Sequence, residues 1–173
     1  MNMKDMPKIM VQAPDPYPSI EVESQNPRYA RLLMEDIASY NGEMTAIYQY
    51  QYQNWILSHQ NQLIASTMQR IARVEMHHLD MLGRLIILLG GDPGCMTIPG
   101  NRRSAWVGNY VNYDKNLRNL LTHNVVAEQA ACRIYKAQVE MIEDKKVSAI
   151  LSRIVRDEEL HVSIFQDFLM YLS

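Results

Sequence analysis

Residues 151–165 read LSRIVRDEELHVSIF, and apolar side chains recur there with the roughly 3.6-residue period of a helix that faces a hydrophobic core. The stripe comprises Leu151, Ile154, Val155, Val162, Phe165 and, further on, Leu169. Glu158 and His161 lie inside this stripe. Because residues three apart lie on the same side of a helix, the two side chains can bind one ion together.

The same arrangement occurs a second time at Glu75 and His78, within an apolar stripe over residues 68–86. Two further glutamates occupy similar positions in two other helical patterns. Glu43 is in line with Tyr40, Ile47 and Tyr50, and Glu128 is in line with Leu121, Val125, Cys132 and Tyr135. Each of four predicted helices therefore contributes at least one carboxylate to a common interior.

The chain is predicted to be all-α: an antiparallel four-helix bundle made of two helical hairpins joined by one long crossover. Capping residues suggest where the four helices start, namely Asn26 with Pro27, Ser58, Asp114 and Asp144. The first two helices should each contain about 30 residues, with the second ending at Gly90–Gly94 and the third near Ile142. Residues 91–113 are expected to form a connection packed by its own aromatic side chains.

Prolines at positions 7, 14, 16 and 18 exclude a helix from residues 1–26, which should run as an extended N-terminal arm. Ile20 to Glu23 could form one short strand at most. We therefore divide the chain into an arm at 1–26 and a bundle at 27–173.

The hairpin geometry tests the carboxylate pattern independently, because ligands at equal height on antiparallel helices lie equally far from the turn between them. Glu43 and Glu75 have their midpoint at residue 59, beside Ser58, and Glu128 and Glu158 have theirs at residue 143, beside Asp144. All four carboxylates are therefore expected near one level of the bundle.

Composition and charge exclude several classes of function. A chain of 173 residues suits one domain, and a net charge of −2 supplies no basic surface for nucleic acid or an anionic membrane. Cys95 and Cys132 form no paired motif, and no signal-peptide or membrane-spanning run is present. We therefore expect a cytoplasmic protein that acts on small molecules or protein partners.

Four buried carboxylates would repel one another, and no Lys or Arg interrupts the four stripes. A single Glu-x-x-His pair is usually a solvated surface feature, but two pairs inside apolar stripes favour a metal site. The six predicted ligands are Glu43, Glu75, His78, Glu128, Glu158 and His161, a set suited to two bridged metal ions in a four-helix bundle. Asp157 could orient His78 by accepting a proton from its far ring nitrogen.

Other polar side chains are open to simpler interpretations. Tyr50 and Tyr135 could fill the core, or could serve the metals through hydrogen bonding or redox chemistry. His77 and Glu159 point about 100° away from the ligands and should face solvent or another subunit. His59 and His123 have no matching partners.

The four ligand-bearing segments resemble those of the ferritin-like superfamily, and of bacterioferritins in particular. They are residues 43–50 (EMTAIYQY), 75–78 (EMHH), Glu128 and 157–161 (DEELH). The resemblance implies that Glu43 and Glu128 are terminal ligands, that Glu75 and Glu158 bridge, and that His78 and His161 each bind one metal. Tyr50 also matches a tyrosine that bacterioferritins carry beside the site.

Several departures bear on the branch of the superfamily. Met76 matches the haem-ligating methionine of bacterioferritins, but we do not expect haem, and the short segment after His161 argues against a ferritin cage. Rubrerythrins usually have another glutamate where this chain has Ala131. Tyr17-Pro18, Asn26-Pro27 and residues 110–114 resemble manganese catalases and their spore-coat relatives.

The expected function is that of a di-metal oxidoreductase acting on H₂O₂ or O₂ as a peroxidase, catalase or ferroxidase, with Tyr50 beside the ligands. The cofactor would be two iron ions or, alternatively, two manganese ions, because oxygen and imidazole ligands accept both metals. Iron storage and a structural coat role with a retained site are the alternatives. We expect a homodimer, and the electron donor is unknown.

Overall fold

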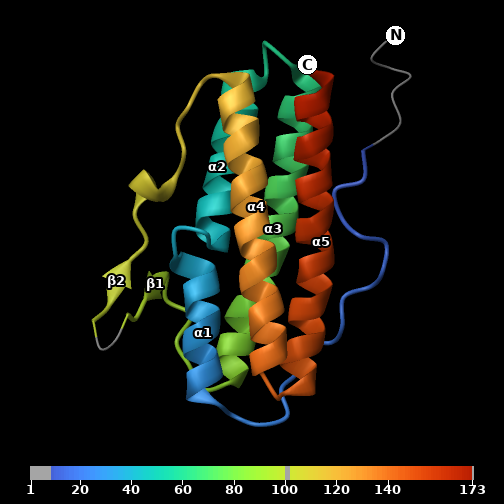
Figure 1. Cartoon of the computed structure of the whole chain (residues 1–173). Helices are drawn as coiled ribbons and strands as arrows, with labels where there is room; N and C mark the ends of the chain where they lie inside the picture. The colour runs from blue at the N-terminus through green and yellow to red at the C-terminus, as the bar shows by residue number, and fades with distance from the viewer. Residues whose placement is uncertain (1–8, 100–101, 173) are drawn as a thin grey trace.

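The computed structural model describes residues 9–99 and 102–172, and within them the chain forms an antiparallel four-helix bundle (Figure 1). The helices are α1 (Pro27–Ala38), α2 (Glu43–Leu57), α3 (Gln62–Leu88), α4 (Leu117–Met141) and α5 (Lys145–Tyr171). The α1 and α2 helices follow one another along the same side of the bundle and pair with α3, while α4 pairs with α5. The predicted all-α fold class is confirmed.

The first long helix of the prediction is wrong, because α1 ends at Ala38 and α2 begins only at Glu43. Gly42 precedes α2 with an extended backbone (φ −90°, ψ 167°). A Cβ atom at this position would lie 2.6 Å from the backbone oxygen of Asp36, so only glycine allows the two segments to approach this closely. No proline lies between residues 27 and 93, but the Asn41-Gly42 dipeptide, which is typical of turns, is a local signal for this break.

The predicted starts of the first and last helices are confirmed. The side chain of Asn26 accepts hydrogen bonds from two backbone amides of α1, and Asp144 does the same at the start of α5. The glycine-rich stop after α3 is also confirmed, since Gly90 has a φ of +85°.

Two predicted helix starts are wrong. Asn61, and not Ser58, caps α3, while the Ser58 hydroxyl donates to the Trp55 carbonyl at the end of α2. Asn116, and not Asp114, caps α4. Asp114 instead accepts from the Asn116 backbone amide and stabilises the loop in front of the helix.

The crossover contains an antiparallel pair of short strands, β1 (Met96–Thr97) and β2 (Ser104–Ala105), with Met96 opposite Ala105. Strands of two residues carry no sequence periodicity, so they were not predicted. A single-turn 3-10 helix follows at Gly108–Tyr110. The crossover aromatics also pack on the bundle, since the Trp106 indole donates to the Thr45 hydroxyl of α2 at 2.9 Å.

Residues 9–26 contain no helix or strand and run along α5 (Figure 1). The short strand considered at Ile20 to Glu23 does not form. The Glu23 amide instead donates to Asp144 at 2.8 Å, next to the start of α5. Residues 1–8 of the predicted arm lie outside the described residues, and the division into arm and bundle stays a prediction.

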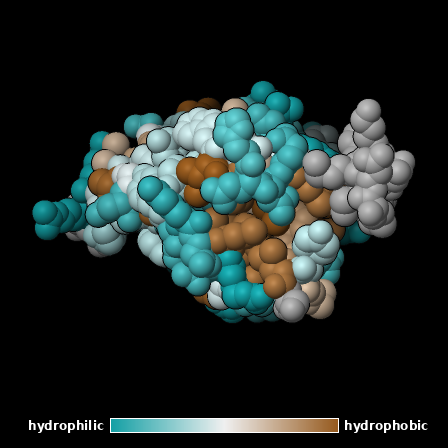
Figure 2. All heavy atoms as spheres, turned by 90° about the horizontal axis from the view of Figure 1, so that it is seen from above, coloured by the Kyte–Doolittle hydropathy of each residue, from teal (hydrophilic) through white to brown (hydrophobic). Residues whose placement is uncertain are grey.

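The apolar core consists of two clusters, one in each half of the bundle. The first joins α1 to the later part of α3 and the early part of α5, and the second joins α2 to the early part of α3 and the later part of α5. Apolar side chains of the bundle reach the surface at the end where α5 stops (Figure 2). None of the described helices is both long and apolar enough to cross a membrane.

Candidate metal centre

The six predicted ligands converge between the two apolar clusters. Glu43 is the first residue of α2, α3 carries one Glu-x-x-His pair, α4 carries Glu128, and α5 carries the second pair. All six side chains are buried, with at most 4% of any residue exposed. The four helices thus place four carboxylates and two imidazoles in a region closed to bulk water.

These side chains form two groups that share two members. Glu43, Glu75, His78 and Glu158 make one group, and Glu75, Glu128, Glu158 and His161 make the other, with the ligand atoms of each group within 4.8 Å of one another. The shared pair, Glu75 and Glu158, occupies the position that bridging ligands of two ions would take.

The Nδ1 atoms of both histidines lie close to the shared carboxylates. Nδ1 of His78 lies 2.9 Å from Glu75 Oε2 and 3.1 Å from Glu158 Oε1. Nδ1 of His161 lies 3.0 Å from Glu75 Oε1 and 3.6 Å from Glu158 Oε2. Both imidazoles therefore turn the same ring nitrogen toward the shared carboxylates.

The donor set fits two divalent cations. In the described part of the chain, no Lys or Arg forms an ion pair with any of the four glutamates. Glu75 Oε1, Glu158 Oε1 and His161 Nδ1 are buried without a hydrogen-bond partner. Buried oxygen and imidazole ligands of this kind suit manganese or iron, which would satisfy these atoms.

The electrostatics of the cluster indicate the same need for positive charge. Burial and repulsion by neighbouring carboxylates raise the pKa values of Glu43 and Glu128 well above their usual range. Burial opposes a charge on His78, but the surrounding carboxylates still raise its pKa well above the usual value. Protons would therefore have to neutralise the cluster wherever cations do not.

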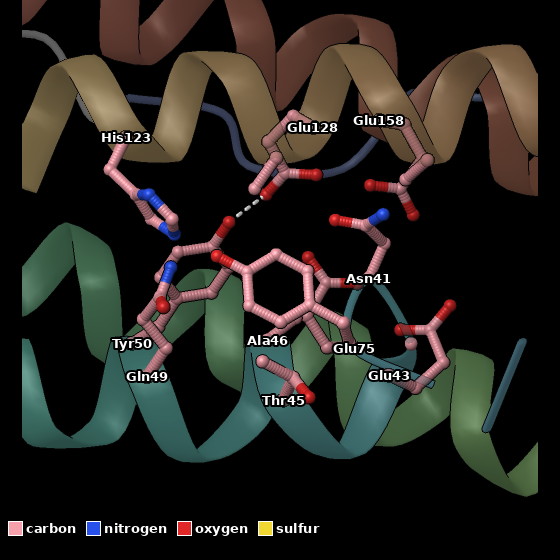
Figure 3. A pocket seen from close by; sticks show the side chains of 14 residues that line it. Asn41, Glu43, Thr45, Ala46, Gln49, Tyr50, Glu75, His123, Glu128 and Glu158 are labelled. Atoms are coloured by element: carbon pink, nitrogen blue, oxygen red, sulfur yellow. Dashed lines mark hydrogen bonds between the residues drawn. The ribbon is translucent and has the colours of Figure 1, made fainter. Parts of the chain in front are cut away.

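Two tyrosines cross the bundle to hold the carboxylates of the facing hairpin. The Tyr50 hydroxyl on α2 donates to Glu128 on α4, as the dashed line in Figure 3 shows. The Tyr135 hydroxyl on α4 donates to Glu43 on α2. Both rings are also buried in the core. The two tyrosines therefore fill the core and also form hydrogen bonds beside the candidate site.

Each histidine is held from behind through its Nε2 atom. His78 Nε2 lies 3.0 Å from Asp157 Oδ2, which confirms the contact predicted from the sequence. Burial alone would raise the pKa of Asp157, but hydrogen bonds from His78, Tyr17, Arg153 and the Ala13 amide hold it at about 2. His161 Nε2 donates to the Val11 carbonyl at 2.8 Å, a contact that no side-chain pattern could indicate.

A cavity of about 30 Å³ lies beside the cluster, with Glu75, Glu128 and Glu158 in its wall (Figure 3). Residues from the break between α1 and α2, from α2 itself and from α4 form the rest of the lining, among them Tyr40, Asn41, Gln49, Tyr50 and His123. Sequence reasoning gave His123 no role and placed Tyr40 in the helical stripe, but Tyr40 lies in the break and is half exposed. Burial lowers the pKa of His123.

The remaining predictions concern side chains outside the cluster. His77 and His59 are exposed, and Glu159 forms an exposed ion pair with Lys136 at 2.6 Å. Met76 is 56% exposed on α3. These residues take no part in the two ligand groups.

A bundle of four helices with a buried cluster of this composition defines the class of ferritin-like di-metal proteins. A family model described as a ferritin-like domain matches residues 38–173. The chain therefore belongs to the ferritin-like family, and the resemblance inferred from its ligand segments is confirmed.

Individual proteins with similar sequences or structures add detail to this family assignment. The chain is 26% identical over 168 residues to a probable manganese catalase of Clostridium acetobutylicum, with 87% of this chain and 74% of that protein covered. KatB, a manganese catalase from Anabaena PCC7120, superimposes with a TM-score of 0.82 at 25% identity, covering 93% of this chain and 80% of that one. A bacterioferritin from Desulfovibrio desulfuricans gives a TM-score of 0.70 at 20% identity, with 86% and 85% covered, and shares the fold.

Proposed function

We propose that this protein is a metal-dependent oxidoreductase of the catalase type, which binds two manganese ions and disproportionates H₂O₂. The observation that carries the proposal is the pair of ligand groups sharing Glu75 and Glu158 beside a cavity of about 30 Å³. The similarity to manganese catalases supports manganese as the metal, since the ligand types alone suit iron equally well.

In the proposed site, Glu43, Glu75, His78 and Glu158 would hold one ion and Glu75, Glu128, Glu158 and His161 the other, with Glu75 and Glu158 common to both groups. One H₂O₂ is oxidised to O₂ with the loss of two electrons and two protons, and a second accepts both to give two molecules of water. When bound, the metal pair supplies the two-electron couple that this exchange requires.

The protein's own contribution begins with the cavity, whose volume is close to that of one or two small molecules such as water or peroxide. Apolar clusters on both sides of the site exclude bulk water. Tyr50 and Tyr135 hold the Glu128 and Glu43 carboxylates by hydrogen bonds, which limits the movement of these ligands.

His123 is the cavity residue best suited to move protons between the two half-reactions. Its side chain borders the cavity and is half buried, and burial lowers its pKa, so the ring is neutral at pH 7. A neutral imidazole can take a proton from the H₂O₂ that is oxidised and return it to the oxygen of the H₂O₂ that is cleaved.

Metal analysis of the protein purified from its native host, combined with O₂ release from H₂O₂, tests the proposal. We expect two manganese ions per chain and one O₂ for every two H₂O₂ consumed. Two iron ions with donor-dependent peroxide reduction would mean that the protein is a peroxidase and not a catalase. Fe²⁺ oxidation with mineral formation would indicate iron storage. Metal binding without any turnover would leave a structural role.

Variants link this activity to the ligand cluster. Glu75→Ala and His161→Ala should each abolish O₂ release and lower the metal content, because each removes a ligand from the buried groups. His59→Ala changes an exposed histidine far along the chain from the ligands and should retain both properties. Full turnover and two metals per chain in the Glu75→Ala variant would reject the assignment.

A further inference from the structure

The N-terminal segment from Val11 to Tyr17 lies against α5, directly behind the two histidines of the candidate metal centre. We propose that this segment is a positioning clamp that fixes which ring nitrogen His78 and His161 present to the metals. The inference rests on the proposed di-metal function, because the clamp has a purpose only if the two imidazoles are ligands.

The contact to His161 is direct. Its Nε2 atom lies 2.8 Å from the backbone carbonyl oxygen of Val11, and both residues are buried. A carbonyl oxygen can only accept, so Nε2 must carry the hydrogen atom. The lone pair of the neutral ring is then on Nδ1, the atom that lies 3.0 Å from Glu75.

The contact to His78 runs through Asp157. Oδ2 of Asp157 accepts from His78 Nε2 and also from the Tyr17 hydroxyl. Oδ1 accepts from the Ala13 amide at 2.7 Å and lies 2.8 Å from Nη1 of Arg153. Two of the four groups that hold this carboxylate therefore come from the arm, and they fix the acceptor that orients His78.

Arg153 fastens the arm to α5. Its side chain is buried, donates from Nε to the Asp15 carbonyl and from Nη2 to the Ala13 carbonyl, both at 2.8 Å, and lies 4.1 Å from the centre of the Tyr17 ring. Arg153, Asp157 and His161 are spaced four residues apart, so they form one row along the helix. The arm follows this row.

The sequence of the arm suits this task. The contacts come from every second residue, namely Val11, Ala13, Asp15 and Tyr17, while the residues between them, Gln12, Pro14 and Pro16, are exposed. Proline lacks a backbone N–H, and at positions 14 and 16 it costs no hydrogen bond, because the arm's contacts to α5 come from the residues on either side.

Tyr17→Phe tests the clamp, because it removes one donor to Asp157 and leaves the ring that Arg153 covers. Groups that orient metal-bound histidines typically contribute 10–100-fold to metal affinity. Because Tyr17 acts on His78 only through Asp157, we expect EDTA to remove manganese from the holoprotein up to about tenfold faster in this variant. Tyr29→Phe is the matched control, because its hydroxyl contacts the Glu143 amide and no part of the metal centre.

Histidine ¹⁵N NMR of the protein loaded with diamagnetic Zn²⁺ separates positioning from general loosening. Wild type should show a protonated Nε2 on both His78 and His161. Tyr17→Phe should shift the His78 Nε2 resonance and leave that of His161 unchanged, because His161 depends on the Val11 carbonyl. Equal shifts of both histidines would indicate a general structural effect and would overturn the clamp.

The two proposals fail differently. If wild type binds two manganese ions, and Tyr17→Phe matches Tyr29→Phe in manganese release and in the histidine spectrum, the clamp is wrong and the proposed function stands. If wild type binds no manganese and has no catalase activity, the proposed function is wrong and the clamp falls with it.

Discussion

Asp36 is a buried carboxyl group that the candidate metal centre does not use. Oδ1 accepts from the Gln138 side-chain amide at 2.7 Å, but Oδ2 is buried without a hydrogen-bond partner. Burial raises the pKa of this group from 3.8 to about 7. Asp36 on α1 thus makes a pH-dependent contribution to stability without belonging to either ligand group.

Asp36→Asn should flatten the pH dependence of folding. The pKa in the folded protein is above the unfolded value, so the folded state keeps a proton that the unfolded state loses, and stability falls as pH rises from about 4 to about 7. The variant lacks this loss and should gain stability relative to wild type at pH 8, by roughly 1–4 kcal/mol. Urea unfolding at pH 5 and pH 8 measures the difference, and an unchanged difference would contradict the assignment.

Tyr50→Phe tests the hydroxyl that holds Glu128. Without this donor, the carboxylate loses a partner in a buried site, and we expect manganese affinity to fall about 10-fold or more. Tyr52→Phe, two residues along the same helix, removes a hydroxyl that contacts only the crossover backbone at 3.5 Å and is the control. Competition with a calibrated chelator measures both, and equal affinities would assign Tyr50 to core filling alone.

Among the elements of the fold, the four ligand-bearing stripes could be predicted because each ligand is marked locally by the apolar positions around it. Glu158 is identifiable within α5 without knowledge of any other helix, and hairpin symmetry then relates it to Glu128. The same alignment of the two hairpins explains the reciprocal hydrogen bonds, in which Tyr50 on α2 contacts Glu128 and Tyr135 on α4 contacts Glu43.

Other elements depend on contacts that residue types indicate weakly or not at all. The break before α2 depends on the close approach of Gly42 to the Asp36 backbone, and it brings Tyr40 to the cavity instead of the core. The arm holds His161 through a backbone carbonyl, which any residue at position 11 would supply. Residue types alone cannot indicate such partners across separations of this length.

The break itself can be tested with two glycines. Gly42→Ala places a Cβ 2.6 Å from the Asp36 backbone oxygen. Because the backbone must move to relieve this contact, the substitution should destabilise the fold by about 1–3 kcal/mol. Gly83→Ala is the matched control, because its Cβ would meet nothing closer than Pro93 at 3.9 Å within α3. Alanine there should stabilise the helix by about 0.5–1 kcal/mol. Urea unfolding compares them, and a neutral Gly42→Ala would contradict the close approach.

At the scale of the whole molecule, the assembly state remains a prediction. Large apolar side chains are exposed on several helices, including Met76 on α3 and Met141 on α4. We expect a homodimer, which native mass spectrometry would record at twice the 20.1 kDa of one chain. A particle of about 24 chains would instead indicate a ferritin-type cage and would return iron storage to consideration.

The cluster of six candidate ligands lies between the two apolar halves of the bundle, so its charge state bears on the stability of the entire fold. In the metal-free protein the buried carboxylates repel one another, and this repulsion raises the pKa values of Glu43 and Glu128. Cations that bind the folded state alone shift the folding equilibrium by mass action, by about 2.7 kcal/mol for one site at a hundredfold excess over Kd.

Manganese at this excess should therefore raise the thermal midpoint by roughly 5–10 °C for one occupied site and by more for two. EDTA should reverse the increase. His161→Ala, which removes one ligand, should show a smaller response to manganese than His59→Ala, which removes an exposed imidazole. A thermal midpoint that is indifferent to manganese in wild type would mean that the six side chains at the centre of the bundle are held together by protons alone.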